Sequence, residues 1–181
     1  MDPTKQYIYP GTLPLDTDGK PIQAHGAGMF YENGTYYWYG ENKEFTTGKN
    51  KVWTWGIRFY SSNDLVNWKD EGLVIPPNTE DKASTLHLHQ HVDRPHILYC
   101  HATKKYVCWL KISAKRGWFT ILTADRLLGP YTMVRDHFEP FGLAAGDFDL
   151  WKDEEGEKAY LFFEHDHLGL AVCELKKISP M

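Results

Sequence analysis

A tyrosine-rich segment occurs three times along the chain, and this repeat restricts the fold more than any other feature. Each copy is a polar turn followed by an aromatic strand, at residues 33–41, 104–109 and 156–164. The interval is 69 residues from Tyr37 to Tyr106 and 54 residues from Tyr106 to Tyr160. Four-stranded units that recur every roughly 40 to 60 residues, with aromatic and glycine punctuation, are typical of β-propeller blades.

We therefore predict an all-β fold, a β-propeller of which this chain supplies fewer than three blades. Residues 1–181 form one partial propeller domain, with blade-like units at about 22–90, 91–145 and 146–181. The third unit ends soon after its expected third strand, so we expect its outer strand to be missing. A β-sandwich of about ten strands is the alternative that the pattern leaves open.

Glycine and proline, 15 and 10 residues, divide the chain into short segments rich in aromatic and β-branched residues. No apolar stripe with the helical period of 3.6 residues continues beyond about two turns. Asn33-Gly34 between two such segments indicates a tight hairpin, because both residues accept a positive φ. The expected strands are Gly28 to Glu32, Thr35 to Glu41, Trp55 to Ser61, Gly72 to Ile75, His96 to His101, Tyr106 to Ile112, Phe119 to Thr123, Asp149 to Lys152, Ala159 to Glu164 and Leu168 to Glu174.

Charge and composition exclude several classes of protein. Lys and Arg number 20 against 24 for Asp and Glu, and 42% of the residues are hydrophobic, which is enough for a packed core. The basic cluster at residues 111–116 is too short and interrupted to neutralise a nucleic acid backbone. No apolar run approaches the roughly 20 residues that span a bilayer. We therefore expect no nucleic acid and no membrane as partners.

The amino terminus, Met1-Asp2-Pro3, does not begin a signal peptide. The compartment stays unknown: we expect a soluble chain, either cytoplasmic or secreted after removal of a leader. Cys100, Cys108 and Cys173 form an odd set without ligand spacing, so we expect buried free thiols, with neither a disulfide framework nor a zinc site.

Acidic residues stand at the ends of the expected inner strands, namely Glu41, Asp93, Asp147, Asp149 and Glu164. Inner strands of a propeller converge on its axis, so carboxylates at equivalent ends of different blades meet in one pocket. Paired carboxylates suit glycoside hydrolysis, with a separation of about 5 Å for retention and roughly 6.5 to 9.5 Å for inversion. Taken singly, each of these residues is more often a turn cap or a surface charge than a catalytic group.

Tryptophan and histidine raise two further questions. Pyranose rings stack on indoles, yet tryptophans in all-β domains usually fill the space between sheets, so we expect one or two of them to touch a ligand. His87, His89 and His91 alternate as metal ligands on a strand would, but no fourth ligand accompanies them, and a solvated polar loop is favoured. The segment 164–167, Glu-His-Asp-His, is judged in the same way and is not assigned as a metal site. We expect no metal and no cofactor, and glycine-rich phosphate loops, G-x-S-x-G and H-E-x-x-H are absent from the sequence.

Three segments together resemble a known family. Residues 16–29 contain Gln-Ala-His-Gly and are followed by Tyr-Gly-Glu within residues 36–43; further on come Asp-Arg-Pro-His at 93–96 and Gly-Asp-Phe-Asp-Leu-Trp at 146–151. This series is similar to the amino-terminal part of the propeller in glycoside hydrolase family 43, particularly its exo-β-1,3-galactanase-like branch. The resemblance covers essentially the whole chain.

The resemblance implies a five-bladed propeller and hydrolysis with inversion. Asp147 aligns with the residue that modulates the pKa of the acid, and Glu41 and Asp93 align with sugar-contacting acids. The usual base position falls near His25-Gly26, which carries no carboxylate, and the acid Glu is expected beyond Met181. The remaining substrate-binding candidates are Gln23 and His25 on the pocket floor, with Asp149, Trp151 and Glu164.

Three functions remain open at this point. The first is a glycosidase that cleaves a β-linked galactan or related plant polysaccharide by inversion, so its partner is an oligosaccharide or polysaccharide. The second is a carbohydrate-binding or catalytically incomplete propeller fragment that needs a partner chain. The third is a structural β-domain without a ligand. An open propeller exposes sheet edges, so we expect a homo-oligomer or a second chain that completes the ring.

Overall fold

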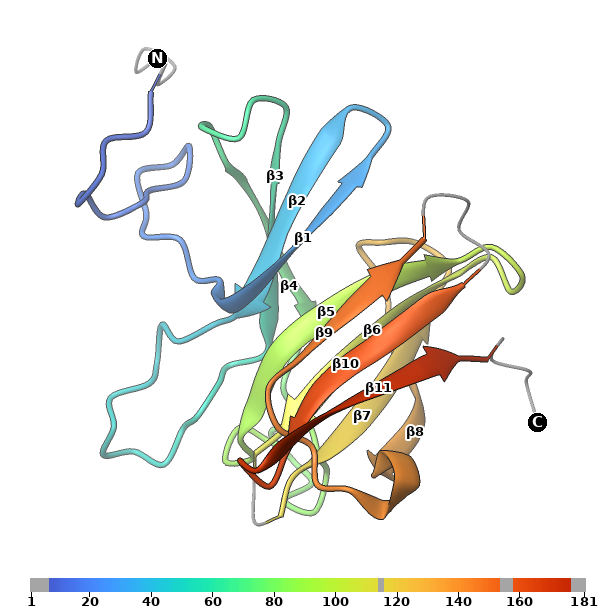
Figure 1. Cartoon of the computed structure of the whole chain (residues 1–181). Coiled ribbons are helices and arrows are strands. Elements are labelled where there is room, and N and C mark those ends of the chain that lie inside the picture. Colours follow the sequence, from blue (N-terminus) through green and yellow to red (C-terminus); the bar gives the residue numbers. More distant parts are fainter. Residues whose placement is uncertain (1–6, 114–115, 154–157, 177–181) are drawn as a thin grey trace.

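The chain folds into three antiparallel sheets that follow one another in sequence (Figure 1). The computed structural model describes residues 7–113, 116–153 and 158–176. The first sheet contains β1 (His25–Glu32), β2 (Thr35–Glu41), β3 (Ile57–Ser62) and β4 (Lys69–Ile75). The second contains β5 (Val92–Cys100), β6 (Lys105–Ile112), β7 (Trp118–Ala124) and β8 (Thr132–Phe138). After a single 3₁₀ turn, η1 (Pro140–Gly142), the third contains β9 (Phe148–Lys152), β10 (Ala159–His165) and β11 (Gly169–Leu175).

Each sheet is an up-and-down meander whose strands pair in chain order. The first strands of the three sheets are neighbours, since β1 contacts β5 and β5 contacts β9. Successive meanders with adjacent inner strands are the arrangement of β-propeller blades, and they differ from the two facing sheets of a sandwich. The predicted all-β partial propeller is confirmed, and the sandwich alternative is wrong.

The predicted Asn33-Gly34 hairpin is confirmed. Glu32 pairs with Thr35, and the two turn residues have φ values of 51° and 82°, as a two-residue turn with two left-handed positions requires. The strand predictions missed β8 and the beginnings of β1, β4 and β5. Residues of β8 are mostly exposed and polar, because an outer strand needs no continuous apolar face, so its hydrophobic signal is weak.

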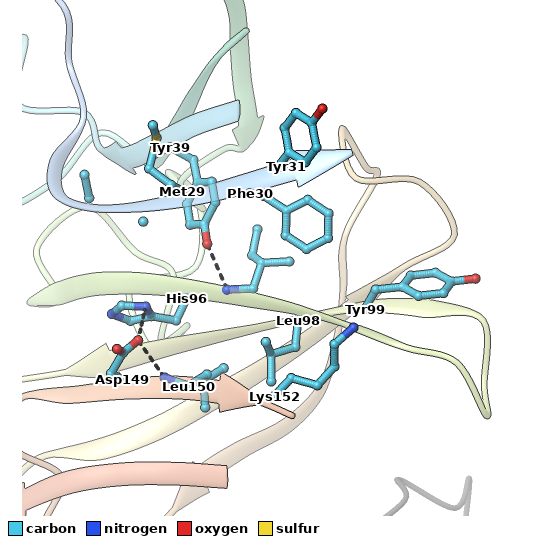
Figure 2. A pocket seen from close by; sticks show the side chains of 13 residues that line it. Met29, Phe30, Tyr31, Tyr39, His96, Leu98, Tyr99, Asp149, Leu150 and Lys152 are labelled. Carbon is cyan, nitrogen blue, oxygen red and sulfur yellow. Dashed lines mark hydrogen bonds and ion pairs between the residues drawn. The ribbon is translucent and has the colours of Figure 1, made fainter. Parts of the chain in front are cut away.

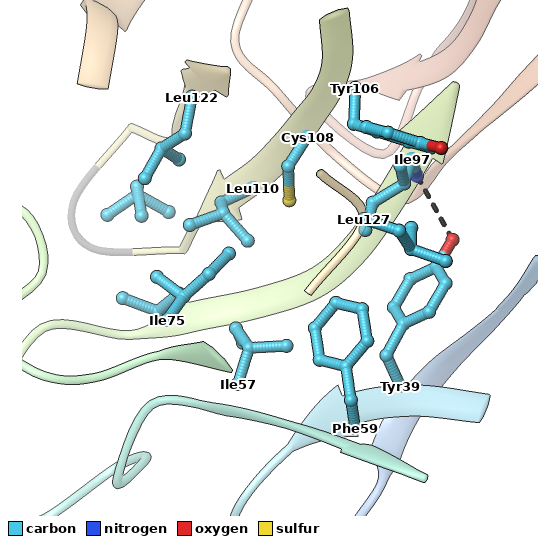
Figure 3. Packing of buried hydrophobic residues seen from close by; sticks show 12 residues of the cluster. Tyr39, Ile57, Phe59, Ile75, Ile97, Tyr106, Cys108, Leu110, Leu122 and Leu127 are labelled. Atoms are coloured by element: carbon cyan, nitrogen blue, oxygen red, sulfur yellow. Dashed lines mark hydrogen bonds between the residues drawn. The ribbon is translucent and has the colours of Figure 1, made fainter. Parts of the chain in front are cut away.

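Two apolar cores hold the sheets face to face. The first lies between the first and second sheets, where Tyr39, Ile57 and Phe59 pack on residues of β5 and β6 (Figure 3). The Tyr39 hydroxyl accepts a hydrogen bond of 3.0 Å from the backbone N–H of Ile97, and burial strongly raises its pKa. The second core joins the second and third sheets through residues such as Phe119, Phe148 and Phe163.

Glycine at position 28 allows Tyr39 to reach the second sheet. A Cβ on Gly28 would lie 2.6 Å from the Tyr39 ring, its partner on the neighbouring strand. The ring therefore crosses the inner strand β1 and reaches β5. Because Gly28 has no side chain, Tyr39 can connect the first blade to the second.

The inner strands β1 and β5 each have a bulge near their first residues. Pairing shifts between His25 and Gly28 in β1 and between Asp93 and His96 in β5. Gly26 and Arg94 occupy the matching places, with φ values of 56° and 47°. A left-handed arginine is uncommon and directs its backbone N–H away from the regular ladder.

The burial of the cysteines and the absence of a membrane span were also predicted from the sequence. Cys108 is buried as predicted, whereas Cys100 and Cys173 are only partly buried, because Cys100 ends β5 and Cys173 lies on the edge strand β11. Within the described ranges, no helix is long and apolar enough to cross a membrane.

Candidate functional site

Acidic side chains from the first and third blades meet at Arg94, beside the bulge of β5. The backbone N–H of Arg94 donates a hydrogen bond of 3.0 Å to Oε1 of Glu41. The side chain of the same residue places its Nε 2.9 Å from Oδ1 of Asp147. Arg94 therefore binds the end of β2 to the residue that precedes β9, and Asp93 stands next to it in the chain. Glu41, Asp93 and Asp147 are called the acidic cluster below.

Glu41 is the most buried of these acids, with 2% of the residue exposed. Its Oε2 lies 2.7 Å from Nζ of Lys43 and 3.5 Å from Nδ1 of His25, whose side chain is exposed. Gln23 supports this end of β2, because its side-chain oxygen accepts a hydrogen bond of 3.2 Å from the Lys43 N–H. A Cβ at residue 26 would lie 2.4 Å from Oε1 of Glu41, so glycine is required there.

Asp93 is also largely buried, with 9% of the residue exposed, and both of its oxygens have donors. The indole Nε1 of Trp53 donates to Oδ1 at 2.5 Å, and the hydroxyl of Ser113 donates to Oδ2. Asp93 is thereby fixed between the loop after β2 and the end of β6.

Asp147 is the exposed member, and two cations contact it. Its Oδ1 lies 2.8 Å from Nζ of Lys111 and 2.9 Å from Nε of Arg94, while 57% of its side chain is accessible. The hydrogen bond from Lys111, together with the charges of Lys111 and Arg94, lowers the pKa of Asp147. Asp147 is therefore a carboxylate at neutral pH and faces solvent.

Glu164 supports the segment that carries Asp147. The Asp147 N–H donates to Oε2 of Glu164 at 3.4 Å, and the carbonyl of Glu164 accepts a hydrogen bond of 2.8 Å from Gly146. Oε1 of Glu164 accepts from the backbone N–H of His167, within a turn whose residues 166 and 167 have positive φ values. Glu164 thus holds backbone in place beside the acidic cluster.

Asp149 lies in a different place, in a cavity of about 430 Å³ between the inner strands. Figure 2 shows Asp149 beside His96, with 3.2 Å between Oδ1 and Nδ1. Tyr39, Tyr31 and Lys152 also line this cavity. Burial lowers the pKa of His96, and the nearby Asp149 charge opposes this shift.

Trp151 is on β9, but it does not contact the acidic cluster in the described structure. Phe148 and Leu150 of this strand are buried, so the alternating Trp151 faces outward and is 51% exposed. The ring centroids of Trp151 and Tyr160 are 5.9 Å apart. Trp53 is the tryptophan that contacts Asp93.

The histidine segment is not a strand, and its imidazoles do not point the same way. His87 is 4% exposed and meets His89 edge to face, while His91 stacks on Trp53. The prediction of a wholly solvated loop is therefore wrong for His87, because an isolated bridge to Asn78 draws it inward. Within the described residues, no three His, Cys, Asp or Glu side chains gather as metal ligands.

Sequence reasoning missed the basic residues of the cluster. Lys111 is the register partner of Asp93 at the end of β6, and this position on a predicted strand was the available signal. The roles of Arg94 and Lys43 depend on a bulge and on a loop, for which the sequence carries no comparable signal.

Consecutive meanders with acids gathered at one end of the first two strands of the blades define the class of this protein, a partial β-propeller with an acidic site. The prediction that all of these acids stand at inner strands is wrong for Glu41 and Glu164, which lie on the second strands β2 and β10. No protein-family model and no curated protein sequence matches the chain. Solved structures do match it. A family 43 β-1,3-galactosidase superposes with a TM-score of 0.81 and 32% identity, over 94% of this chain and 36% of that one.

Two further enzymes, one fungal and one bacterial, show the same likeness. The exo-β-1,3-galactanase of Phanerochaete chrysosporium, solved with galactose, has a TM-score of 0.80 and 27% identity over 92% of this chain and 38% of its own. The exo-β-1,3-galactanase of Clostridium thermocellum has a TM-score of 0.78 and 29% identity over 94% and 38%. The chain is therefore similar to part of the propeller of family 43 exo-β-1,3-galactanases, and it spans less than two fifths of the length of these enzymes.

Proposed function

We propose that this chain binds the terminal galactose of a β-1,3-linked galactan at the cluster formed by Glu41, Asp93 and Asp147, as the sugar-holding part of an inverting glycoside hydrolase. The observation that carries the proposal is the convergence of acids from the first and third blades on Arg94, the residue that follows Asp93 on the second blade. The likeness to an exo-β-1,3-galactanase solved with galactose supports the choice of sugar.

Carboxylates accept hydrogen bonds from sugar hydroxyls, and each charge-assisted bond contributes about 1.5 to 3 kcal/mol. Glu41 and Asp93 are suited to this work because protein donors already fix their orientation. Asp147 is exposed and carries charge, so it is placed to influence the ionisation of a neighbouring acid. Gln23 and His25 belong to the floor beside Glu41.

A second function is favoured by one observation. Inverting hydrolysis needs a protonated carboxylic acid, and Asp147, whose pKa is lowered by Lys111, does not supply it at neutral pH. The alternative proposal is therefore that this chain by itself binds the sugar and that a partner completes catalysis.

The partner would be a second polypeptide or a second copy of the chain. The outer face of the third sheet supports this proposal, because Phe162, Leu170 and Val172 expose 42%, 83% and 57% of their surface beside Trp151. An apolar sheet face of this kind is suited to packing against another sheet.

Product analysis tests the proposed function. The chain is incubated with β-1,3-galactobiose, and the released sugar is followed by ¹H NMR from the first minutes. Release of α-galactose first supports an inverting hydrolase, whereas binding without release supports the sugar-holding alternative. Absence of both binding and release contradicts the proposal.

A further inference from the structure

Trp53 lies in the loop between β2 and β3 and contacts the acidic cluster from the side. Its indole Nε1 is 2.5 Å from Oδ1 of Asp93. The imidazole of His91 stacks on the ring with centroids 4.3 Å apart and an interplanar angle of 17°. Nζ of Lys43 lies 4.3 Å from the same ring centroid.

We propose that Trp53 is a positioning residue that acts through Asp93: its indole N–H holds the carboxylate for a sugar hydroxyl, and its ring is not a stacking platform for the sugar. This inference rests on the proposed galactose site and adds a residue that determines the site's geometry.

The neighbours of the ring argue against stacking by a sugar. A pyranose needs an open aromatic face, but His91 lies parallel to the Trp53 ring at contact distance. Lys43 is also over the ring and is held there by two bonds, an ion pair of 2.7 Å with Glu41 and a hydrogen bond of 2.7 Å to the carbonyl of Trp53. Stacking by a sugar on the faces these groups occupy would require their displacement.

The surroundings of Asp93 explain why the N–H edge matters. A carboxylate has about four lone-pair directions on two oxygens. Trp53 takes one on Oδ1 and Ser113 takes one on Oδ2, so the plane of the group is set from two sides. In this proposal the remaining directions accept sugar hydroxyl groups, and loss of either donor lets the carboxylate rotate.

Trp118 offers a matched control within the same chain. His137 stacks on it with centroids 4.3 Å apart and an interplanar angle of 16°, nearly the geometry of the Trp53 pair. Within the described residues its Nε1 has no hydrogen-bond partner. Trp118→Phe therefore removes an indole from a histidine stack without touching the acidic cluster.

Calorimetric titration with galactose separates positioning from stacking. Trp53→Phe keeps an aromatic ring and removes the N–H, and we expect galactose affinity to fall about tenfold, while Trp118→Phe leaves it within twofold. In an Asp93→Ala background, Trp53→Phe should cause no further loss, because the effect passes through Asp93. Ser113→Ala should weaken binding in the same direction as Trp53→Phe. A Trp53→Phe variant that binds as wild type, while Trp53→Ala loses binding, would show stacking and overturn the inference.

A second readout needs no ligand. The indole N–H resonance that disappears in Trp53→Phe should move upfield in Asp93→Ala and stay in place in Asp149→Ala. An unmoved resonance in Asp93→Ala overturns the inference by itself. Failure of the wild type to bind galactose contradicts the proposed function instead, so the two failures are distinguished.

Discussion

The backbone N–H of Arg94 donates to the buried carboxylate of Glu41 at 3.0 Å, across 53 residues of sequence. This bond exists because Arg94 adopts a φ of 47° within the bulge of β5, which turns its amide toward the first blade. The side chain of the same residue then reaches Asp147 before the third blade. One strained position therefore sets the relative placement of two acids from different sheets.

Gly26 tests the close approach of β1 to Glu41. Alanine at Gly26 or at Gly34 adopts a positive φ, which costs about 1 to 2 kcal/mol in either place. Only at Gly26 would the new Cβ collide, at 2.4 Å from Oε1 of Glu41. We expect Gly26→Ala to lower the thermal midpoint by about 3 to 6 °C more than Gly34→Ala does, and to abolish galactose binding. Equal midpoints and equal affinities for the two variants would contradict this account of the site.

Glu41 is expected to contribute both to the fold and to binding. Glu41→Gln removes the charge opposite Lys43 in a buried pair, where loss of one partner is strongly destabilising. We expect galactose affinity to fall tenfold or more and the thermal midpoint to drop, by calorimetry and circular dichroism. Glu44→Gln, in the neighbouring exposed pair with Arg58, serves as the control and should leave binding unchanged. A Glu41→Gln variant with wild-type affinity would place this acid outside the sugar site.

The pH dependence of binding should report Asp147. Lys111 lowers the pKa of Asp147, so this carboxyl group keeps its negative charge at pH values below the usual pKa of an aspartate. The charge is lost only as the pH falls through the lowered pKa. Binding that depends on this charge should persist above the lowered pKa and decline beneath it. Lys111→Met should move that decline to higher pH, whereas Lys105→Met, which removes an exposed partner of Asp125, should not. Identical acid limbs for wild type and Lys111→Met would refute the coupling. In the completed enzyme, Asp147→Asn should reduce turnover by about 10² or more.

Association through the third sheet is a separate prediction. Light scattering coupled to size exclusion should show a species larger than the 21.0 kDa chain at micromolar concentration. Leu170→Glu with Val172→Glu places charge on the exposed face and should shift the population toward monomer. A well-folded wild-type monomer with no partner present would contradict the assembly proposal.

Local pattern was enough to predict much of the fold. The aromatic repeat and the Asn33-Gly34 turn identified the meanders, because alternation and turn chemistry are properties of neighbouring residues. The outer strand β8 was missed, since its exposed residues carry no apolar alternation.

The site was less predictable, because it depends on contacts between sheets. Glu41 and Asp147 were selected from their places at strand ends, but their bridge through Arg94 depends on a bulge. Side chains alternate along β9, so Trp151 and the buried Leu150 lie on different faces of the sheet. The outward position of Trp151 could therefore have been predicted from the sequence. Lys111 could be placed on a predicted strand, but the register that brings it beside Asp93 could not be predicted, because pairing between strands determines it.

Galactose titration followed by backbone and indole NMR tests the central claim most directly. The account predicts that the largest shift changes occur at the Arg94 amide, which reports Glu41, and at the Trp53 indole, which reports Asp93. These signals should saturate together, while amides around His96 and Asp149 in the cavity change little. Saturable changes confined to the cavity, or no changes at millimolar galactose, would contradict a sugar site at the acidic cluster.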